Sequence, residues 1–436
     1  MLWEAHPHWS PPWAYVVTPS WLRQARDLVR RAGLRVILDL NLVTGSPRAA
    51  GRWAKAAVRG LPHGSIVGFE VGNEPDLYSR RYWMATVARS PLQSSPLPFE
   101  LSPATYVQDF AAYSRVLGET APDIPLVGPA VAHPRVGLPF ITTLIANQRA
   151  ELGLVSGHIY PYSACVKNPR ARDYPTVPRI LSRAAVSAFS YDIAGAVSAA
   201  HANGLKFRLT EFNSVTCGGK ARVSDTFATA LWAPDALFTA MRAGADGANL
   251  HVRASAINAA FAISRGGLTA RPLLYGLLLF NRTLGPQARL VRVRVTAPRS
   301  IELSTWATTV RGGILHVLLI DKSNRSVRVS LHLPAAGPAG VQRLLAPSAH
   351  SRWGVTLNGQ QLNYSGNWSG IARSETVSPG PGGYTLTVPR LSAALMTVRL
   401  GSGAARPRSA ASEHHRRVAV AHHAVLAVRL HRTRKH

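Results

Sequence analysis

Cysteine, acidic residues and long apolar runs are all scarce in this chain of 436 residues. Its two cysteines, Cys165 and Cys217, are too few for a disulfide-rich scaffold or a cysteine-rich zinc site. The best candidate for a membrane span is residues 273–280 (LLYGLLLF), which is much shorter than the roughly 18 apolar residues required. We therefore expect a buried helix there and no membrane span.

Signals for targeting and for metal binding are also missing. The first residues, MLWEAHPHWSPPW, lack the basic and then apolar layout of a secretory signal peptide, so we expect no export signal at this N-terminus. Histidine, cysteine and carboxylate residues do not cluster with the spacing of metal ligands. We therefore expect neither a metal nor another cofactor.

Basic residues greatly outnumber acidic ones, with 50 Lys and Arg against 21 Asp and Glu, and the formal net charge is +29. The excess reflects either a generally basic composition of solvated arginines or an anionic substrate or polymer. Nucleic acid is not an expected partner, because the basic residues are dispersed and no nucleic-acid-binding motif is present.

A hydrophobic fraction of 46% is sufficient for a large buried core. Residues 1–283 alternate short apolar runs with helical patterns, which is typical of βα units around a parallel sheet. The runs are almost continuously apolar, as strands covered on both faces must be. They predict strands at residues 35–41, 66–71, 126–130, 154–160, 207–211 and 247–252.

The pattern changes after residue 283. Residues 284–400 contain segments that alternate apolar and polar residues between turn-rich pieces, which predicts an antiparallel β-sandwich. Its strands are expected at residues 290–295, 314–320, 326–333, 384–388 and 394–400. Residues 401–436 are basic and rich in histidine, and we expect them to form a disordered tail.

Two glutamates stand at the ends of predicted strands. Glu74 follows the strand at 66–71 within Gly-Asn-Glu-Pro, and Glu211 ends the strand at 207–211 within Thr-Glu-Phe-Asn. Active sites of (β/α) barrels lie where strands end, and cleavage of a glycosidic bond needs a pair of carboxyl groups. A single carboxylate at a strand end is more often structural, but two of them in one barrel indicate a glycosidase.

The motif Asn73-Glu74-Pro75 resembles the acid/base motif at the fourth strand of the clan of retaining TIM-barrel glycosidases. Glu211 then matches the clan's nucleophile at the seventh strand. Wider strings resemble glycoside hydrolase family 79, the β-glucuronidase and heparanase family, over roughly residues 15–400. These strings are GFEVGNEPDLY (68–78), SGHIYPY (156–162), RLTEFNSVTCGG (208–219), SDTFATALWAPDALF (224–238) and RPLLYGLLLF (271–280).

This resemblance implies a (β/α)8-type TIM barrel followed by a β-sandwich, and an extracellular or periplasmic enzyme. It implies hydrolysis of β-glucuronides by double displacement, with the carboxyls of Glu74 and Glu211 about 5–5.5 Å apart. A related glycosidase for a neutral β-linked sugar is the first alternative. The second is a catalytically inactive protein that binds carbohydrate or polyanions.

Position along the strands suggests further substrate-binding residues: Asn73, His158, Tyr160, Gly218, Gly219, Lys220, His251 and Arg253. Asn73 would hydrogen-bond the sugar 2-hydroxyl, or simply make a turn. Tyr160 would place a hydroxyl near the nucleophile, or pack as a barrel aromatic. The backbone amides at residues 217–219, helped by Lys220 or Arg253, would hold a carboxylate, although Gly218-Gly219 is equally explained as a turn.

Several polar residues near the two glutamates have structural explanations. Glu70 is expected inside the barrel, and Asp76 and Asp225 are expected to cap or orient neighbouring segments. Arg208 shares a strand with Glu211, so it needs a carboxylate partner if it is buried.

Cys165 and Cys217 each follow the end of a predicted strand. The two strands are neighbours in the expected barrel, so their loops leave the same face side by side. The cysteines are therefore either close enough for a disulfide or two unrelated thiols.

Counting strands backwards from Glu74 predicts an incomplete barrel. If Glu74 ends the fourth strand, residues 35–41 form the third, and only 34 residues precede them. A helix at 21–31, with Ser20 as its cap, uses many of these, whereas one βα unit needs roughly 30 residues. We therefore expect a TIM barrel that lacks its first two strands and is inactive or poorly folded alone.

Overall fold

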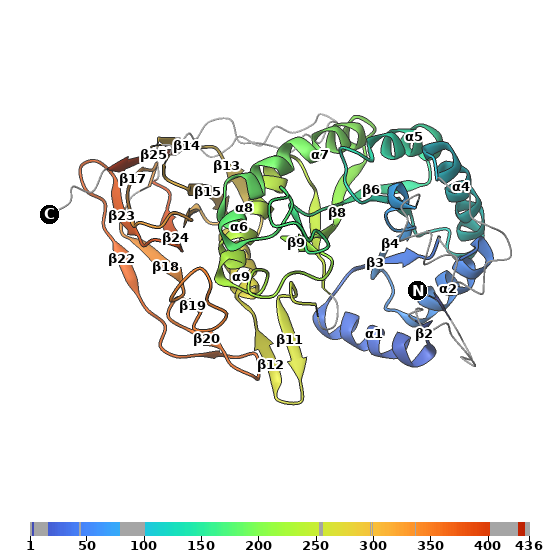
Figure 1. Cartoon of the computed structure of the whole chain (residues 1–436), viewed down its shortest axis with the longest axis horizontal. Coiled ribbons are helices and arrows are strands. Elements are labelled where there is room, and N and C mark those ends of the chain that lie inside the picture. The colour runs from blue at the N-terminus through green and yellow to red at the C-terminus, as the bar shows by residue number, and fades with distance from the viewer. Residues whose placement is uncertain are drawn as a thin grey trace. The chain divides into compact units, whose positions relative to one another are not determined.

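The computed structural model in Figure 1 describes residues 2–3, 16–42, 45–78, 101–252, 256–296, 298, 300–335, 337–401 and 426–431. The chain divides into two compact units. Unit 1 comprises Met1–Ile159, Tyr191–Phe212 and Ala243–Leu250. Unit 2 comprises Tyr160–Ser190, Asn213–Arg242 and His251–His436. The domain boundaries predicted at residues 283 and 400 stay a prediction.

The central element of unit 1 is a parallel six-stranded sheet. Every strand lies beside its neighbour in the sequence, which is the order of a barrel and not of a doubly wound sheet with a reversal point. Each of the six runs predicted from the sequence contributes one strand. The strands are β3 (Val36–Leu40), β4 (Ile66–Val71), β5 (Leu126–Val131), β6 (Leu152–Ile159), β8 (Lys206–Phe212) and β10 (Gly247–Leu250).

The sheet is thus a curled parallel half-barrel, as expected from the continuous apolar runs. A separate parallel pair joins β1 (Leu2–Trp3) and β2 (Val16–Val17). The absence of the first two barrel strands stays a prediction.

Proline lies in the first turn of four helices in the described part of unit 1, where its missing N–H costs no hydrogen bond. These helices are α1 (Pro19–Ala32), α2 (Pro47–Gly60), α4 (Pro103–Thr120) and α5 (Leu138–Gln148). Helix α1 begins earlier than predicted, because the Thr18 side chain and not Ser20 accepts a hydrogen bond from Trp21 N. Its end at Gly33, with φ 61°, is the left-handed cap that glycine favours.

Two tyrosines of α4 hold the ends of neighbouring strands. The Tyr106 hydroxyl donates to Val71 O at 2.8 Å, and the Tyr113 hydroxyl donates to Asn41 O at 2.8 Å. Tyr106 is fully buried, so this hydrogen bond satisfies a polar group that would otherwise be costly. These contacts fix the rim from which the loop carrying Glu74 leaves.

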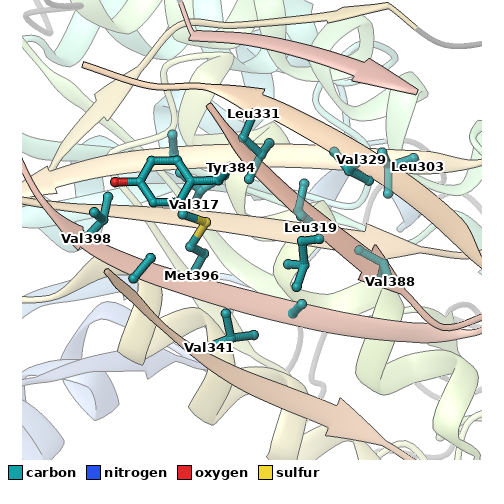
Figure 2. Close-up of a cluster of buried hydrophobic side chains, with 14 of the residues drawn as sticks. Leu303, Val317, Leu319, Val329, Leu331, Val341, Tyr384, Val388, Met396 and Val398 are labelled. Atoms are coloured by element: carbon teal, nitrogen blue, oxygen red, sulfur yellow. The ribbon is translucent and has the colours of Figure 1, made fainter. Parts of the chain in front are cut away.

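Unit 2 contains a β-sandwich of two sheets. The larger, seven-stranded sheet consists of β13 (Arg289–Val291), β15 (Leu303–Val310), β16 (Ile314–Asp321), β24 (Ser392–Arg399), β18 (Ala339–Leu345), β19 (Thr356–Leu357) and β22 (Glu375–Val377). The smaller sheet consists of β14 (Val293–Thr296), β25 (Leu426–His431), β17 (Val327–His332) and β23 (Tyr384–Val388). Figure 2 shows their shared core, where Val317 and Met396 of one sheet pack with Val329 and Leu331 of the other.

Strand β16 is covered on both faces. Val317 and Leu319 point into the sandwich, whereas Leu318 and Ile320 join a second cluster with the helices α8 (Phe227–Arg242) and α9 (Pro272–Leu284). This two-residue alternation between two cores explains why the sequence of β16 is almost entirely apolar.

A buried ion pair joins α8 to the larger sheet. Lys322 Nζ lies 2.5 Å from Asp235 Oδ2, and both side chains are 2% exposed. Asp235 also accepts hydrogen bonds from Ser304 Oγ at 2.7 Å and from Trp306 Nε1 at 2.8 Å. Because every bond of this carboxylate is internal, α8 is fixed firmly against the sheet.

The structure corrects two sequence expectations for the C-terminal part. The predicted segment 290–295 is divided between β13 and β14, which belong to different sheets. The predicted disorder of residues 401–436 is wrong at Leu426–His431, which form β25 between β14 and β17. Its apolar residues alternate with a period of two, a pattern hidden by the basic surroundings. Residues 402–425 and 432–436 lie outside the described residues.

Several smaller elements complete unit 2. The strand β7 (Tyr162–Ser163) pairs in parallel with β9 (Val215–Thr216), and β11 (Phe261–Ser264) forms a hairpin with β12 (Gly267–Ala270). The remaining elements are α6 (Val177–Leu181), β20 (Gln361–Leu362) and β21 (Trp368–Ser369), while α7 (Ala184–Ala202) runs through both units. Among the residues that the structure describes, no helix has the length and apolar character needed to cross a membrane.

Candidate active site

Glu74 lies on a turn at the rim of β4 in a strained backbone conformation. Gly72 has φ 81°, and a side chain there would approach Leu42 Cδ2 within 2.9 Å. Glu74 itself has φ 52°, which is uncommon for a residue with a side chain and is found at sites where geometry serves function. Its N–H donates to Ala130 O at 2.9 Å, so β5 holds this turn in place.

Asp76 makes a second connection between the turn after β4 and the end of β5. Its carboxylate accepts a hydrogen bond from Ala132 N at 2.9 Å. Asp76 therefore orients the turn that carries Glu74, the kind of role expected of it from the sequence.

Glu211 is directed by an irregularity in β8. Gly157 of β6 pairs with Leu209, but the next residue, His158, pairs with Glu211 and skips Thr210. Such a bulge inserts one extra residue and turns the following side chain to a new direction, often next to an active site. The bulge places Glu211 opposite His158.

His158 lies between the two glutamates. Its Nδ1 is 3.0 Å from Glu74 Oε1 and 3.9 Å from Glu211 Oε2. The His158 side chain is 1% exposed, whereas Glu74 and Glu211 are 19% and 28% exposed. Burial alone would lower the pKa of His158, but the hydrogen bond to Glu74 and the negative charge of Glu211 outweigh it and raise the pKa above its ordinary value.

The two carboxyl groups lie close together. One ligand atom from each of Glu74, His158 and Glu211 lies within 4.8 Å of the other two. Carboxyls in inverting glycosidases are roughly 6.5–9.5 Å apart, to leave room for a water molecule, and those in retaining enzymes about 5–5.5 Å. The spacing fits the retaining geometry.

Within the described part of the chain, the same three side chains form a group that could hold a cation. Sequence spacing did not indicate it, because the three ligands come from three separate strands. The His158–Glu74 contact at 3.0 Å is a hydrogen bond, however, and it uses the ring nitrogen that a metal would need. The contact also allows a proton to pass between His158 and Glu74.

Two further carboxyl groups lie deeper in unit 1. Asp39 of β3 and Glu70 of β4 are direct partners across the parallel strands. Asp39 Oδ1 and Glu70 Oε1 are buried without a hydrogen-bond partner in the described structure. Burial, followed by the charge of Glu70, raises the pKa of Asp39 to about 7, and burial also raises the pKa of Glu70. Glu70 was expected inside the barrel, whereas Asp39 was missed because it interrupts an apolar run by a single residue.

The other predicted site residues, apart from Asn73, belong to unit 2. Asn73 is half-buried beside Glu74 in unit 1. The rings of Tyr160 and His251 meet edge to face with centroids 6.3 Å apart. Arg253 lies outside the described residues.

Cys165 and Cys217 form a disulfide bond, with their Cα atoms 5.9 Å apart. The parallel pairing of β7 with β9 brings the two loops side by side, as the sequence positions predicted.

The loop expected to hold a carboxylate uses several of its donors internally. Gly219 N donates to Thr216 O at 3.2 Å, and Lys220 N donates to Ser224 Oγ at 3.0 Å. Lys220 Nζ donates to Pro175 O at 3.3 Å and lies 3.6 Å from the centroid of the Tyr174 ring. Gly218 accepts a hydrogen bond from Ile257 N at 2.8 Å through its carbonyl group. Gly219 and Lys220 therefore have structural roles in this conformation.

Asn213 was missed in the sequence, although it directly follows the strand of Glu211. It is fully buried, and its side-chain amide donates to Asn258 O at 2.9 Å and to His251 O at 3.2 Å. This amide fixes the loop after β8 within unit 2. A polar residue just beyond an apolar strand end was the signal available.

Arg208 and Asp225 are two charged residues near Glu211 whose partners are seen in the structure. A carboxylate partner was expected for Arg208 only if it is buried, but the side chain is half-buried, and its Nε donates to Asn249 Oδ1 at 2.9 Å. An amide oxygen suffices because the guanidinium remains partly in contact with solvent. Asp225 is buried and lies 2.6 Å from Arg352 Nε, which links the loop after β8 to the region of the β-sandwich.

Comparison with known proteins identifies the fold first. The structure resembles a 4-O-α-L-rhamnosyl-β-D-glucuronidase from Fusarium oxysporum 12S, with a TM-score of 0.70, 18% identity, and coverage of 91% of this chain and 85% of that one. It also resembles the family 51 α-L-arabinofuranosidase AbfB from Bifidobacterium longum, with a TM-score of 0.58, 14% identity, and coverage of 86% and 78%. No protein of curated function matches the sequence. The fold is that of the TIM-barrel glycosidases.

A match to a protein family covers the C-terminal part of the chain. Residues 300–395 match the glycosyl hydrolase family 79 C-terminal β domain. This match confirms the resemblance to glycoside hydrolase family 79 over these residues.

Proposed function

We propose that this protein is a retaining glycoside hydrolase that cleaves β-glucuronides, with Glu211 as the nucleophile and Glu74 as the acid/base. The observation that carries the proposal is the approach of the Glu74 carboxyl, from the turn after β4, and the Glu211 carboxyl, from β8, to within 4.8 Å of each other and of His158. At this distance one carboxylate can attack the sugar directly, whereas an inverting enzyme needs a wider gap that holds a water molecule.

The reaction would proceed by double displacement. Glu211 attacks the anomeric carbon while a proton passes from Glu74 to the leaving oxygen, which breaks the glycosidic bond and leaves a glycosyl ester on Glu211. Water then attacks the same carbon with Glu74 as base, which releases the sugar with its original configuration.

His158 would keep a proton available at this site. Its raised pKa and its 3.0 Å contact with Glu74 Oε1 favour a proton held between the two side chains. The same ring lies 3.9 Å from Glu211, where a positive charge favours the ionised nucleophile.

The preference for a β-glucuronide is supported by the family match and by the net charge of +29. The similar Fusarium structure is named as a β-D-glucuronidase, which agrees with this substrate class. A neutral β-linked sugar is the second candidate, and it is favoured by the internal contacts that occupy Lys220 and Gly219.

Action outside the cytoplasm is part of the proposal. The Cys165–Cys217 disulfide supports it, because such bonds persist mainly in oxidising compartments.

The proposal is tested by hydrolysis of aryl β-glucuronide, β-glucoside and β-galactoside by the purified chain. No hydrolysis of any of the three would contradict it and would agree with the inactivity expected from the sequence. We expect the glucuronide to react fastest, and Glu211→Ala to lower its kcat by at least about 1,000-fold. Glu119→Ala, at an exposed glutamate of α4, is the matched control and keeps full activity. Equal rates on the three sugars would contradict the glucuronide preference, and unchanged activity of Glu211→Ala would contradict the assigned nucleophile.

A further inference from the structure

A cavity of about 280 Å³ lies in unit 2. It is lined by β12, Tyr275, residues 352–355, residues 361–364 and Ser369. Glu74, His158 and Glu211 are not among the described residues that line it. Pockets for drug-sized ligands measure about 300–1,000 Å³, so this cavity suits a ligand of about one sugar ring.

Two hydrogen bonds and one close backbone approach hold the residues that line this cavity. Leu268 N donates to Tyr364 O at 2.7 Å, and Leu362 N donates to the hydroxyl of Tyr275 at 2.8 Å. Gly267 has φ 102°, and a side chain there would lie 2.4 Å from Tyr364 O. Glycine therefore allows the β11–β12 hairpin to approach the opposite wall closely.

Two aromatic side chains of the lining are strongly exposed. Trp353 is 64% exposed and Tyr364 is 71% exposed. Exposed aromatic rings beside a cavity are available to contact a ligand. The C–H groups on one face of a pyranose carry partial positive charge, so they are attracted to the negative face of such a ring.

Polar groups suited to sugar hydroxyls line the same cavity. Gln361 and Asn363 supply amides. Asn363 Oδ1 accepts hydrogen bonds from Ser365 N and Asn367 N, both at 3.0 Å, while its amide nitrogen has no partner in the described part of the chain. That nitrogen is therefore left to donate to a ligand.

The charge of the cavity is largely balanced. Its guanidinium, from Arg352, is paired with Asp225 at 2.6 Å. Pairing removes most of the attraction for an anionic group, so hydroxyl groups are better partners here than a carboxylate.

We propose that this cavity is a second carbohydrate-binding site, which takes one neutral pyranose unit of an oligosaccharide or polysaccharide. Trp353 and Tyr364 contact the apolar face of the ring, and Gln361 and Asn363 bind its hydroxyls. The site holds a glycan and does not cleave it, and the proposal does not depend on the hydrolytic activity of the chain.

The test measures binding of methyl β-D-glucopyranoside and of methyl β-D-glucuronide by tryptophan fluorescence and saturation-transfer NMR. The Glu211→Gln chain is used, so that neither sugar can be consumed. We expect the glucoside to bind, and Trp353→Ala and Tyr364→Ala each to weaken that binding at least about 10-fold. Tyr191→Ala, at a ring that is 68% exposed and does not line the cavity, is the matched control and leaves binding unchanged.

Absence of glucoside binding, or binding that survives both aromatic substitutions, would overturn the proposal. Binding of the glucuronide alone through Trp353 would overturn its restriction to neutral sugars. The fully active chain carrying Trp353→Ala should hydrolyse small aryl glycosides at the original rate. Because that activity is read separately, failure of the second site and failure of the proposed enzyme function remain distinguishable.

Discussion

Replacing Asp39 with asparagine should change how the stability of the protein depends on pH. Asp39 Oδ1 is buried, its partner across the strands is Glu70, and its pKa is raised from 3.8 to about 7. The folded protein therefore binds this proton more tightly than the unfolded chain does. The resulting stabilisation is fully present below about pH 4 and is lost as the pH rises through about 7.

The size of the effect follows from the two pKa values. The difference between 3.8 and about 7 corresponds to at most about 4 kcal/mol of unfolding free energy. Between pH 5 and pH 8.5 the part that is lost is about 2–3 kcal/mol. Asparagine has nearly the same shape and no charge, so Asp39→Asn should be more stable than the original protein at pH 8.5 and should lose less stability between the two pH values.

Urea unfolding of both proteins at pH 5 and pH 8.5 measures this directly. Asp123→Asn, at an exposed aspartate, is the matched control and should follow the original protein. If Asp39→Asn and the original protein lose the same unfolding free energy between the two pH values, the argument from a buried, proton-binding carboxyl is wrong.

Three further predictions concern the catalytic pair, the buried ion pair and the disulfide. Glu74→Ala should slow aryl glycosides with poor leaving groups far more than those with good ones, because only the former need its proton; equal losses in steady-state kinetics would argue against the acid/base role. Lys322→Met should lower the free energy of unfolding, measured in urea, by about 3–5 kcal/mol, because it leaves the Asp235 carboxylate buried and unpaired. The double variant Lys322→Met/Asp235→Leu should recover most of that loss. Unchanged stability of Lys322→Met would refute the pairing. Cys165→Ser should lower the free energy of unfolding, measured in urea, by about 2–4 kcal/mol. The original chain, unfolded in the presence of a strong reductant, should lose the same amount and no more.

The strands around the site were predictable from the sequence because burial on both faces leaves a simple signal. The run at 66–71 is mainly apolar and is followed three residues later by Glu74, while the run at 207–211 keeps apolar residues at alternate positions and ends in Glu211. That pattern was enough to predict β4, β8 and the proximity of Glu74 and Glu211.

The geometry of the site depends on how neighbouring strands are aligned, which the sequence of a single strand does not show. The bulge at Thr210 exists only in the register between β6 and β8, and it decides which residue faces His158. The pairing of Asp39 with Glu70 likewise appears only when two strands are aligned. Long-range pairing of this kind has no periodic signal in the sequence.

The C-terminal strands show a related limit. Strand β25 joins β14 and β17 from more than 90 residues away in sequence, within a segment whose charge predicted disorder. Strand β15 is rich in serine and threonine, so its inward face was not recognisable until its partners Val317 and Leu319 were known.

The most direct test of the central claim is to trap the glycosyl-enzyme. The purified chain is incubated with a 2-deoxy-2-fluoro-glucuronyl fluoride, whose fluorine slows hydrolysis of the covalent intermediate, and is then digested for peptide mass spectrometry. The account predicts one added sugar on the peptide that contains Glu211, formed in the original protein and absent from Glu211→Ala. A label on any other carboxylate, or catalytic turnover with inversion of the anomeric configuration, would contradict it.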